Sequence, residues 1–540
     1  MDMIRKHKKA IQTVVGLGIF ALALFVVIFF IFKRCRAEYN ADYTDTLLWA
    51  NAAVESGHFY NPDYWYAYFL PFSGVPIMIP IVAVFGLTYF SHQLGMTVFA
   101  LLFGAALFAF MKAMNQNNGE SLALSGITMI LMCCSQITRM IFYGHIIHYS
   151  LAIVFMCVGF CLLKRSDAFY PGSKKGRIYT ILAAVWCMLC TTNGMATVVL
   201  FFIPFAGCLV MERYFDARPI SLKGDAPLIK TVSWLAAGGA VGYIIKMIFF
   251  SSTEYEDSIT ALLPSDGWVF KQSPFLLEWI KVLTEFSGGD VPVKSFEGIR
   301  MLSLYLLALV ILIVPFFAIL SYKKIRDRML RLLIIYYWIM FAMTILTYSV
   351  SYAVVQTWRL AGLVCTALIL TMLYTVYMIR SARHVRWFVP IVPVIALCVF
   401  ISMLDVKYIP SALNYNQNDS LISIFREHGL TRGYSFFWNS ANAATVLSDS
   451  EIVVSPIVIN PDGTYEVRKY QSEPWEYEDV PGLDRYFVVI DSQEMEYAAD
   501  TLAKHKIEEI KYQDHLYIWV FDRNIFHDLK PVFCEKKEDS

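Results

Sequence analysis

The chain has 540 residues, of which 57% are hydrophobic and only 16% are charged. Soluble domains carry about a quarter charged residues and spread their apolar residues in short periodic bursts, so this composition excludes an ordinary soluble globular protein. The 45 basic and 44 acidic residues are also unevenly divided: residues 405–540 hold 13 basic and 24 acidic residues. The chain therefore combines a basic, apolar region with an acidic, more polar one.

Apolar runs long enough to cross a bilayer follow one another along residues 1–404. The first, at 11–32, follows a basic segment, and no small-residue cleavage site comes after it. This pattern predicts a retained span with a cytoplasmic N-terminus. We expect ten further spans, at 91–111, 121–141, 146–163, 178–193, 195–211, 231–250, 299–320, 332–350, 361–379 and 387–404.

The apolar stretch at residues 71–90 is interrupted by helix breakers, namely Pro71, Gly74, Pro76, Pro80 and Gly86. With eleven spans, the inner connections hold 22 Lys and Arg and the outer connections hold 9. A twelfth span at this stretch would change the numbers to 10 inside and 21 outside, against the positive-inside rule. We therefore expect this segment to lie along or dip into the outer leaflet, as the end of a long external loop at 33–90.

Beyond residue 404 the pattern changes to the short segments of a small α/β domain. An odd number of spans places this domain, residues 405–540, on the outer side of the plasma (inner) membrane. Its expected helices are at 417–428, 439–449 and 494–505, and its expected strands are at 434–438, 451–459, 485–491, 506–512 and 516–522.

The first external loop carries the acids best suited to chemistry at the membrane boundary. Asp42 and Asp45 are three residues apart, so in a helix they share one face, where a carboxylate can deprotonate a hydroxyl or bind a cation. The alternative is that both are solvated loop acids. Asp63 follows Asn61 and Pro62, a sequence typical of a turn, and is a weaker candidate for substrate binding.

Two other external segments carry candidate substrate-binding residues. The connection after residues 121–141 holds Arg139, Tyr143, His145 and His148; its two histidines have the spacing of metal ligands, but no carboxylate or cysteine beside them completes a site. Arg359 stands at the outer end of the 361–379 span, where a guanidinium can bind a phosphate diester or simply anchor the helix at the interface. We predict no metal site from these residues and no nucleic-acid partner. No cofactor is certain, and a divalent cation stays an open alternative.

The order of these features resembles the GT-C superfamily of glycosyltransferases, and within it the protein O-mannosyltransferase and aminoarabinose-transferase branch. The resemblance lies in the cytoplasmic N-terminus, the Asp-containing helix about fifteen residues before a glycine (Asp42 to Gly57), the aromatic stretch after it and the proline-broken segment that ends in Phe85-Gly86. It implies transfer of a sugar from a polyprenyl-phosphate carrier to an external acceptor, which is a glycan, lipid or protein.

The resemblance also implies residue roles. The first-loop acid of that branch is the general base, which corresponds to Asp42 here; Asp45 is the rival, because Tyr43 stands where the branch has a second acid. Arg359 corresponds to the residue that holds the carrier phosphate, with Arg139 as a second phosphate ligand. Two other functions stay open: a non-enzymatic lipid or polymer flippase or export component, and a membrane-anchored sensor or binding protein. Charged residues are almost absent from the expected spans, which disfavours an ion-coupled transporter.

Overall fold

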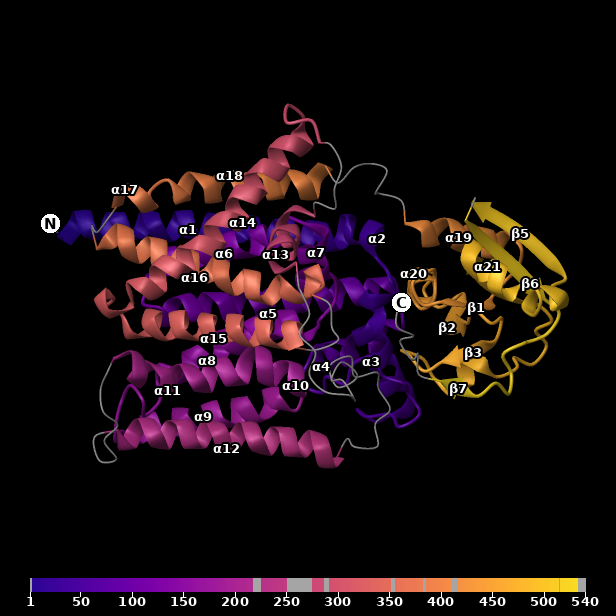
Figure 1. The fold of residues 1–540 in the computed structure, drawn as a ribbon, viewed down its shortest axis with the longest axis horizontal. Coiled ribbons are helices and arrows are strands. Elements are labelled where there is room, and N and C mark those ends of the chain that lie inside the picture. The colour runs from indigo at the N-terminus through magenta and orange to yellow at the C-terminus, as the bar shows by residue number, and fades with distance from the viewer. Residues whose placement is uncertain are drawn as a thin grey trace.

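The computed structural model describes residues 2–216, 225–249, 274–285, 291–350, 355–381, 385–408, 416–513 and 515–532. Long helices lie side by side in one bundle, and a sheet-containing domain sits at one end of it, away from the N-terminus (Figure 1). Both parts of the predicted fold are therefore present. The architecture is that of a polytopic helical membrane protein with a C-terminal α/β domain.

Every expected span has a helix at its position. Within the described residues, eight helices are long and apolar enough to cross a membrane, and a bent pair makes a ninth if it is counted as one span. The bundle helices are α1 (Asp2–Lys33), α5 (Tyr89–Ala113), α6 (Asn118–Leu131), α8 (His148–Leu163), α9 (Lys174–Thr191), α10 (Met195–Thr197) with η3 (Val198–Phe202) and α11 (Ile203–Phe215), α12 (Ala226–Phe249), α14 (Phe296–Leu320), α15 (Arg328–Val350), α16 (Ala361–Arg380) and α18 (Ile391–Tyr408).

The first span packs against the third through glycines. A Cβ added to Gly16 of α1 would lie 2.1 Å from the carbonyl oxygen of Gly119 in α6, so only glycine permits this approach of the two backbones. Close contact between small residues is a main source of helix association where lipid removes the hydrophobic driving force.

The segment at 71–90 does not form a span. Its helix α4 (Val75–Phe85) has 11 residues, which is about 16 Å of helix and roughly half the hydrocarbon thickness. Gly86 ends it with a positive φ of 74°. The structure therefore agrees with the eleven-span expectation for this stretch.

The expected span at 121–141 is not one continuous helix, which corrects that boundary. α6 ends at Leu131, and the axis bends by 116° into α7 (Gln136–Arg139) and the π-helix η2 (Met140–Gly144). Ser135 and Thr138 form a capping box that starts the new helix within the apolar run. The bend carries residues 140–147 across the end of the bundle nearest the C-terminal domain.

The C-terminal domain is built on a seven-stranded sheet of order β5-β6-β4-β1-β2-β3-β7, in which the central strand β1 is parallel to both neighbours. The strands are β1 (Arg432–Phe436), β2 (Val453–Ile459), β3 (Tyr465–Arg468), β4 (Tyr486–Asp491), β5 (Glu508–Gln513), β6 (Leu516–Phe521) and β7 (Pro531–Val532). The sheet helices are α19 (Gln417–Glu427), α20 (Ala443–Leu447) and α21 (Ser492–Ala498).

Three details of this domain differ from the sequence expectation. The first strand begins two residues earlier than expected, the helix expected at 494–505 is split into α21 and the 3-10 helix η9 (Leu502–His505), and the short strands β3 and β7 were not predicted. β3 has four residues and β7 two, too few for an alternating pattern to be recognised.

The domain is held on the first loop by backbone and side-chain bonds. Trp65 and Ser472 form an isolated antiparallel bridge, with a 2.9 Å bond from the Trp65 N–H to the Ser472 carbonyl. Asn416 donates to the carbonyl oxygens of Arg36 and Tyr39, both at 2.7 Å. A single hydrophobic core also continues from the bundle into α19, α20 and the sheet. Between the domain and the loop lies a cavity that is lined by residues of both.

Candidate active site

The first wall of this space is the start of the external loop. The side chain of Asn40 accepts a 3.0 Å hydrogen bond from the Asp42 N–H and caps the 3-10 helix η1 (Ala41–Thr44), after which α3 (Asp45–Ser56) begins at once. Asp42 and Asp45 therefore lie one turn apart and line the same cavity. The predicted sharing of one face by these two acids is present in the structure.

The second wall is formed by the π-helix η2 and the segment that follows it. The Nδ1 of His145 lies 3.0 Å from the carbonyl oxygen of Asp42, and because a carbonyl only accepts, Nδ1 carries the proton. Burial lowers the pKa of His145 to about 4, so the ring is neutral at pH 7. Its Nε2 is buried and has no hydrogen-bond partner among the described residues. The rest of this wall is apolar and consists of Met140, Ile141, Ile146 and Ile147.

The third wall is η6 (Thr357–Leu360), which precedes α16. Arg359 is 6% exposed, and its guanidinium lies 5.0 Å from the ring centre of Trp358 and 5.6 Å from that of Tyr348. Within the part of the chain that the structure describes, it forms no salt bridge with a carboxylate. A buried guanidinium that lies against aromatic rings and has no described carboxylate partner keeps donors for an anion.

The fourth wall comes from the C-terminal domain. Arg468, at the end of β3, lines the cavity and packs its guanidinium 4.3 Å from the ring centre of Tyr470. Gln471 accepts a 2.9 Å hydrogen bond from the hydroxyl of Thr44, which fixes this strand end against the loop of Asp42. Trp438 lines the same cavity and is 55% exposed, so its ring is available to a ligand.

Together the four walls enclose a cavity of about 270 Å³. Burial raises the pKa of Asp42 to about 7, against the lowering effect of the Arg468 charge. Burial, and then the charge of Asp42, raise the pKa of Asp45 to about 7. A carboxylate pair with these pKa values exchanges protons near neutral pH, as general acid and base chemistry requires.

Two of the predicted site residues lie outside the cavity in a structural role. Arg139 is 4% exposed and forms ion pairs with Glu38 at 2.5 Å and with Asp405 at 2.6 Å, which join α2 (Cys35–Glu38), α7 and α18. Its guanidinium is thus neutralised within the protein. The hydroxyl of Tyr143 donates to the carbonyl oxygen of Met129 at 2.8 Å, so it is buried and satisfied.

The remaining predicted residues also lie apart from the cavity. His148 packs its ring 4.0 Å from that of Tyr149 and lines a separate small pocket between α8 and α15. Asp63 is exposed, and its N–H bonds the side chain of Asn61 in the expected turn. Among the described residues, no group of three or more His, Cys, Asp and Glu is placed to hold a metal ion.

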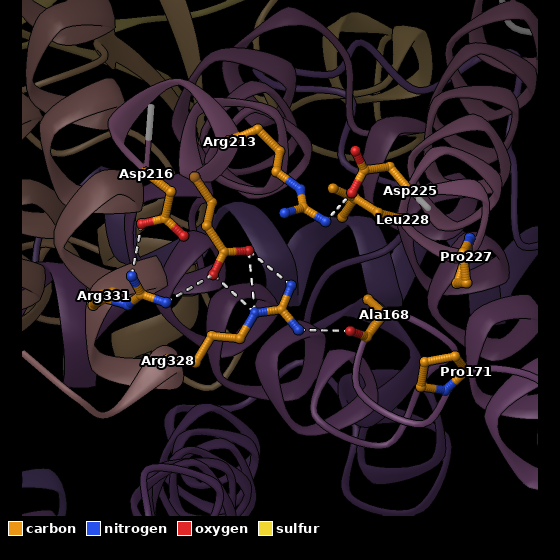
Figure 2. Close-up of a pocket in the computed structure, with 10 residues that line it drawn as sticks. Ala168, Pro171, Arg213, Asp216, Asp225, Pro227, Leu228, Arg328 and Arg331 are labelled. Carbon is orange, nitrogen blue, oxygen red and sulfur yellow. Dashed lines mark hydrogen bonds and ion pairs between the residues drawn. The ribbon is translucent and has the colours of Figure 1, made fainter. Parts of the chain in front are cut away.

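A second polar cavity, of about 310 Å³, lies at the opposite end of the bundle. Figure 2 shows its charged side chains bonded to one another: Arg331 to Asp216, Arg213 to Asp225, and Arg328 to the carbonyl oxygen of Ala168. Arg328 and Arg331 also pair with Glu212. Since these basic groups already have acidic partners, we interpret the cluster as a set of ion pairs that joins α11 to α15 rather than as an active site.

Sequence reasoning missed Arg468 and Trp438. The signal for Trp438 is a tryptophan at the end of the expected strand at 434–438, which alone is weak. For Arg468 the strand itself was not predicted, so nothing in the sequence placed its side chain.

Comparison with known proteins identifies the fold. No family model matches the chain, and no curated protein sequence matches it. Two structures of ArnT from Cupriavidus metallidurans, one bound to undecaprenyl phosphate and one in the apo state, match 93% of this chain and 97% of theirs, with a TM-score of 0.53 and 10% identity. The chain has the GT-C fold. The oligosaccharyltransferase of Archaeoglobus fulgidus, tethered with an acceptor peptide, is similar over 93% of this chain and 74% of its own, with a TM-score of 0.45 and 11% identity.

The GT-C fold agrees with the resemblance noted in the sequence and with an integral membrane protein. At 10% identity the likeness concerns the fold and not the chemistry. The chemistry has to be argued from the cavity between the helical bundle and the C-terminal domain.

Proposed function

We propose that this protein is a membrane glycosyltransferase that moves a sugar from a polyprenyl-phosphate carrier to an acceptor on the outer side of the membrane. The observation that carries the proposal is the gathering of Asp42, Asp45, Arg359 and Arg468 in one cavity. The fold supports it as well, since ArnT of this fold is known bound to undecaprenyl phosphate.

The donor phosphate is assigned to Arg359. A carrier lipid cannot leave the bilayer, so its sugar phosphate has to be met at the level of the head groups. Arg359 stands two residues before the first residue of α16, in a wall that continues into the bundle, and its donors are not used by a described carboxylate. A guanidinium there neutralises the charge that develops on the phosphate as it leaves.

The general base is assigned to Asp42, with Asp45 as its rival. The base accepts the proton of the acceptor hydroxyl while the acceptor oxygen bonds to the anomeric carbon. The bond from that carbon to the phosphate oxygen breaks in the same step, and the carrier phosphate leaves with the electron pair. One direct displacement of this kind inverts the anomeric centre. A pKa near 7 suits this role, because the acid is ionised in part and still basic.

His145 is assigned a positioning role. Its Nδ1 donates to the carbonyl oxygen of Asp42 and holds that backbone in place, while the neutral ring lines the cavity. The C-terminal domain completes the site with Arg468 and Trp438. We also propose that this domain is extracytoplasmic, which a reporter fused to the C-terminus tests.

The cavity favours an enzyme over the two other candidates. A sensor on a membrane base needs no clustering of loop acids, whereas Asp42 and Asp45 lie together. A flippase needs a polar path through the bilayer, whereas the wall toward the bundle is made of Met140, Ile141 and two further isoleucines.

The direct test is turnover of a polyprenyl-phosphate sugar by the purified protein, followed by release of the free carrier phosphate. We expect Asp42→Asn to lower the rate by about 10²–10⁴-fold, which is the usual contribution of a general base. Asp63→Asn is the matched control, because it removes the same charge from the same loop at an exposed position outside the cavity. Full activity of both Asp42→Asn and Asp45→Asn would show that neither acid is the base.

A further inference from the structure

An apolar cavity of about 640 Å³ lies at the end of the bundle that points away from the C-terminal domain. It is lined by residues from α14, the connection after α14, α16, α17 (Val385–Phe388) and the start of α18, among them Leu320, Lys324, Tyr374, Met378, Trp387 and Ile391. α17 and the N-terminus of α1 lie at this same end (Figure 1). The cavity is separate from the candidate active site and has the size of a small-molecule pocket.

α18 and α14 are joined away from the cavity, and α17 contacts α16 beside it. Cys398 of α18 donates to the Ser303 carbonyl of α14, whereas at this end Phe388 of α17 packs on Tyr374 of α16, with ring centres 5.4 Å apart. The α14 side of the gap is therefore left uncovered, and Leu320 is 81% exposed and Trp387 66% exposed.

The polar groups in the wall already bond within the protein. The hydroxyls of Ser321 and Tyr374 lie 2.7 Å apart, and the hydroxyl of Tyr377 accepts from the Arg326 N–H at 3.1 Å. What the wall offers to a ligand is hydrocarbon. Each CH₂ group transferred from water to such a surface contributes about 0.8 kcal/mol.

The rim of the cavity is basic. Lys324 lines it, and Arg386 stands beside Trp387 in α17. None of the described residues that line the cavity is acidic. Basic pockets between spans on the inner side of a membrane bind anionic lipid head groups.

We propose that this cavity binds one acyl chain of an anionic phospholipid from the leaflet facing away from the C-terminal domain, with the head-group phosphate at Lys324. The chain fills the apolar gap between α14, α16 and α17, and the negative head group meets the basic rim. The proposal does not depend on the glycosyltransferase function.

Native mass spectrometry of the delipidated full chain tests it, with dioleoyl phosphatidylglycerol and dioleoyl phosphatidylcholine as probes. We expect one molecule of the anionic lipid to bind more tightly than the zwitterionic one. Lys324→Gln should weaken the binding of the anionic lipid about fivefold, which is the contribution of one basic group at a charged membrane surface. Lys323→Gln is the matched control. It removes the same charge from the neighbouring residue, whose side chain is exposed and does not line the cavity.

A filling variant tests the apolar part. Met378→Trp places a larger ring in the gap and should abolish retention of the anionic lipid; Ile391→Trp serves the same purpose if the first variant elutes as an aggregate. Equal binding of the two lipids, equal effects of the two lysine variants, or full retention by a folded filling variant would each overturn the proposal. So would selective displacement of the phospholipid by a polyprenyl phosphate.

Discussion

The positive charge of Arg468, in the C-terminal domain, acts on Asp42, the proposed general base. Removal of this charge gives a quantitative prediction for the pKa of Asp42. In Arg468→Gln the cavity loses the cation that lowers the pKa of Asp42, while burial continues to raise it. In a medium with an effective dielectric constant of about 20, a unit charge on the order of 8 Å away changes the free energy of ionisation by about 2 kcal/mol. This corresponds to about 1.5 pH units, and water in the cavity reduces the expected shift to about one unit.

The assay is the pH dependence of kcat/KM for release of the carrier phosphate. Its acid limb reports the ionisation of the base in the free enzyme. The wild-type limb should lie near pH 7, because burial raises the pKa of Asp42 to about 7, and in Arg468→Gln it should move to near pH 8. Arg468→Lys keeps the charge and should leave the limb close to its wild-type position.

Lys469→Gln is the matched control for this experiment. Lys469 is the next residue in the chain, but its ammonium lies 5.8 Å from the ring centre of Trp65 and does not line the cavity. A merely structural effect of Arg468→Gln would lower the rate at all pH values without moving the limb. An unmoved limb, or an equal shift in Lys469→Gln, would refute the reasoning.

Three further predictions concern the donor, the fold and the acid limb. Arg359→Gln should lower kcat/KM for the polyprenyl-phosphate sugar by about 10–100-fold, the value of a hydrogen bond to a charged group, and a value within twofold of wild type would contradict the assignment. Arg139→Met leaves Glu38 without its partner and Asp405 with only the longer pair to Arg300 at 3.7 Å, and it should destabilise the protein by about 3–5 kcal/mol, measured by thermal unfolding in detergent; an unchanged melting temperature would contradict it. For the wild type, lowering the pH from 7 to 5 should reduce turnover about 50-fold, because a carboxyl with a pKa of about 7 is then almost fully protonated; a flat profile with intact fold would argue against Asp42 and Asp45 as bases.

Much of the fold was predictable because its signals are local. A span satisfies its own backbone hydrogen bonds and is recognised from its own residues, so the positions of the helices followed from hydropathy. The prolines at 76 and 80 likewise indicated that 71–90 is not a span, and α4 is short. The break after Leu131 was missed, since a capping box of Ser135 and Thr138 inside an apolar run does not alter the hydropathy.

The candidate site was predictable only where its residues are neighbours in the chain. Asp42 and Asp45 share a face because they are separated by one turn, which is a matter of spacing. Arg139 and Arg359 looked alike in the sequence, each a single arginine at the outer end of a span. The structure separates them, because Arg139 meets Glu38 and Asp405 while Arg359 meets aromatic rings.

The amino-acid sequence alone predicts a membrane bundle with an acidic C-terminal domain and two first-loop acids that share one helical face. Those properties depend on apolar runs, charge balance and helical spacing, which are read over a few tens of residues. Only the tertiary structure decided which cations join the acids. The charge of Arg468 acts on Asp42 because the short strand β3, which the sequence does not predict, docks against the first loop. Arg139 instead forms ion pairs with two acids that are distant in the chain, Glu38 and Asp405. A charged side chain is available to a ligand only if the fold brings no opposite charge within a few ångströms of it. Spacing along the chain does not determine which charges become neighbours.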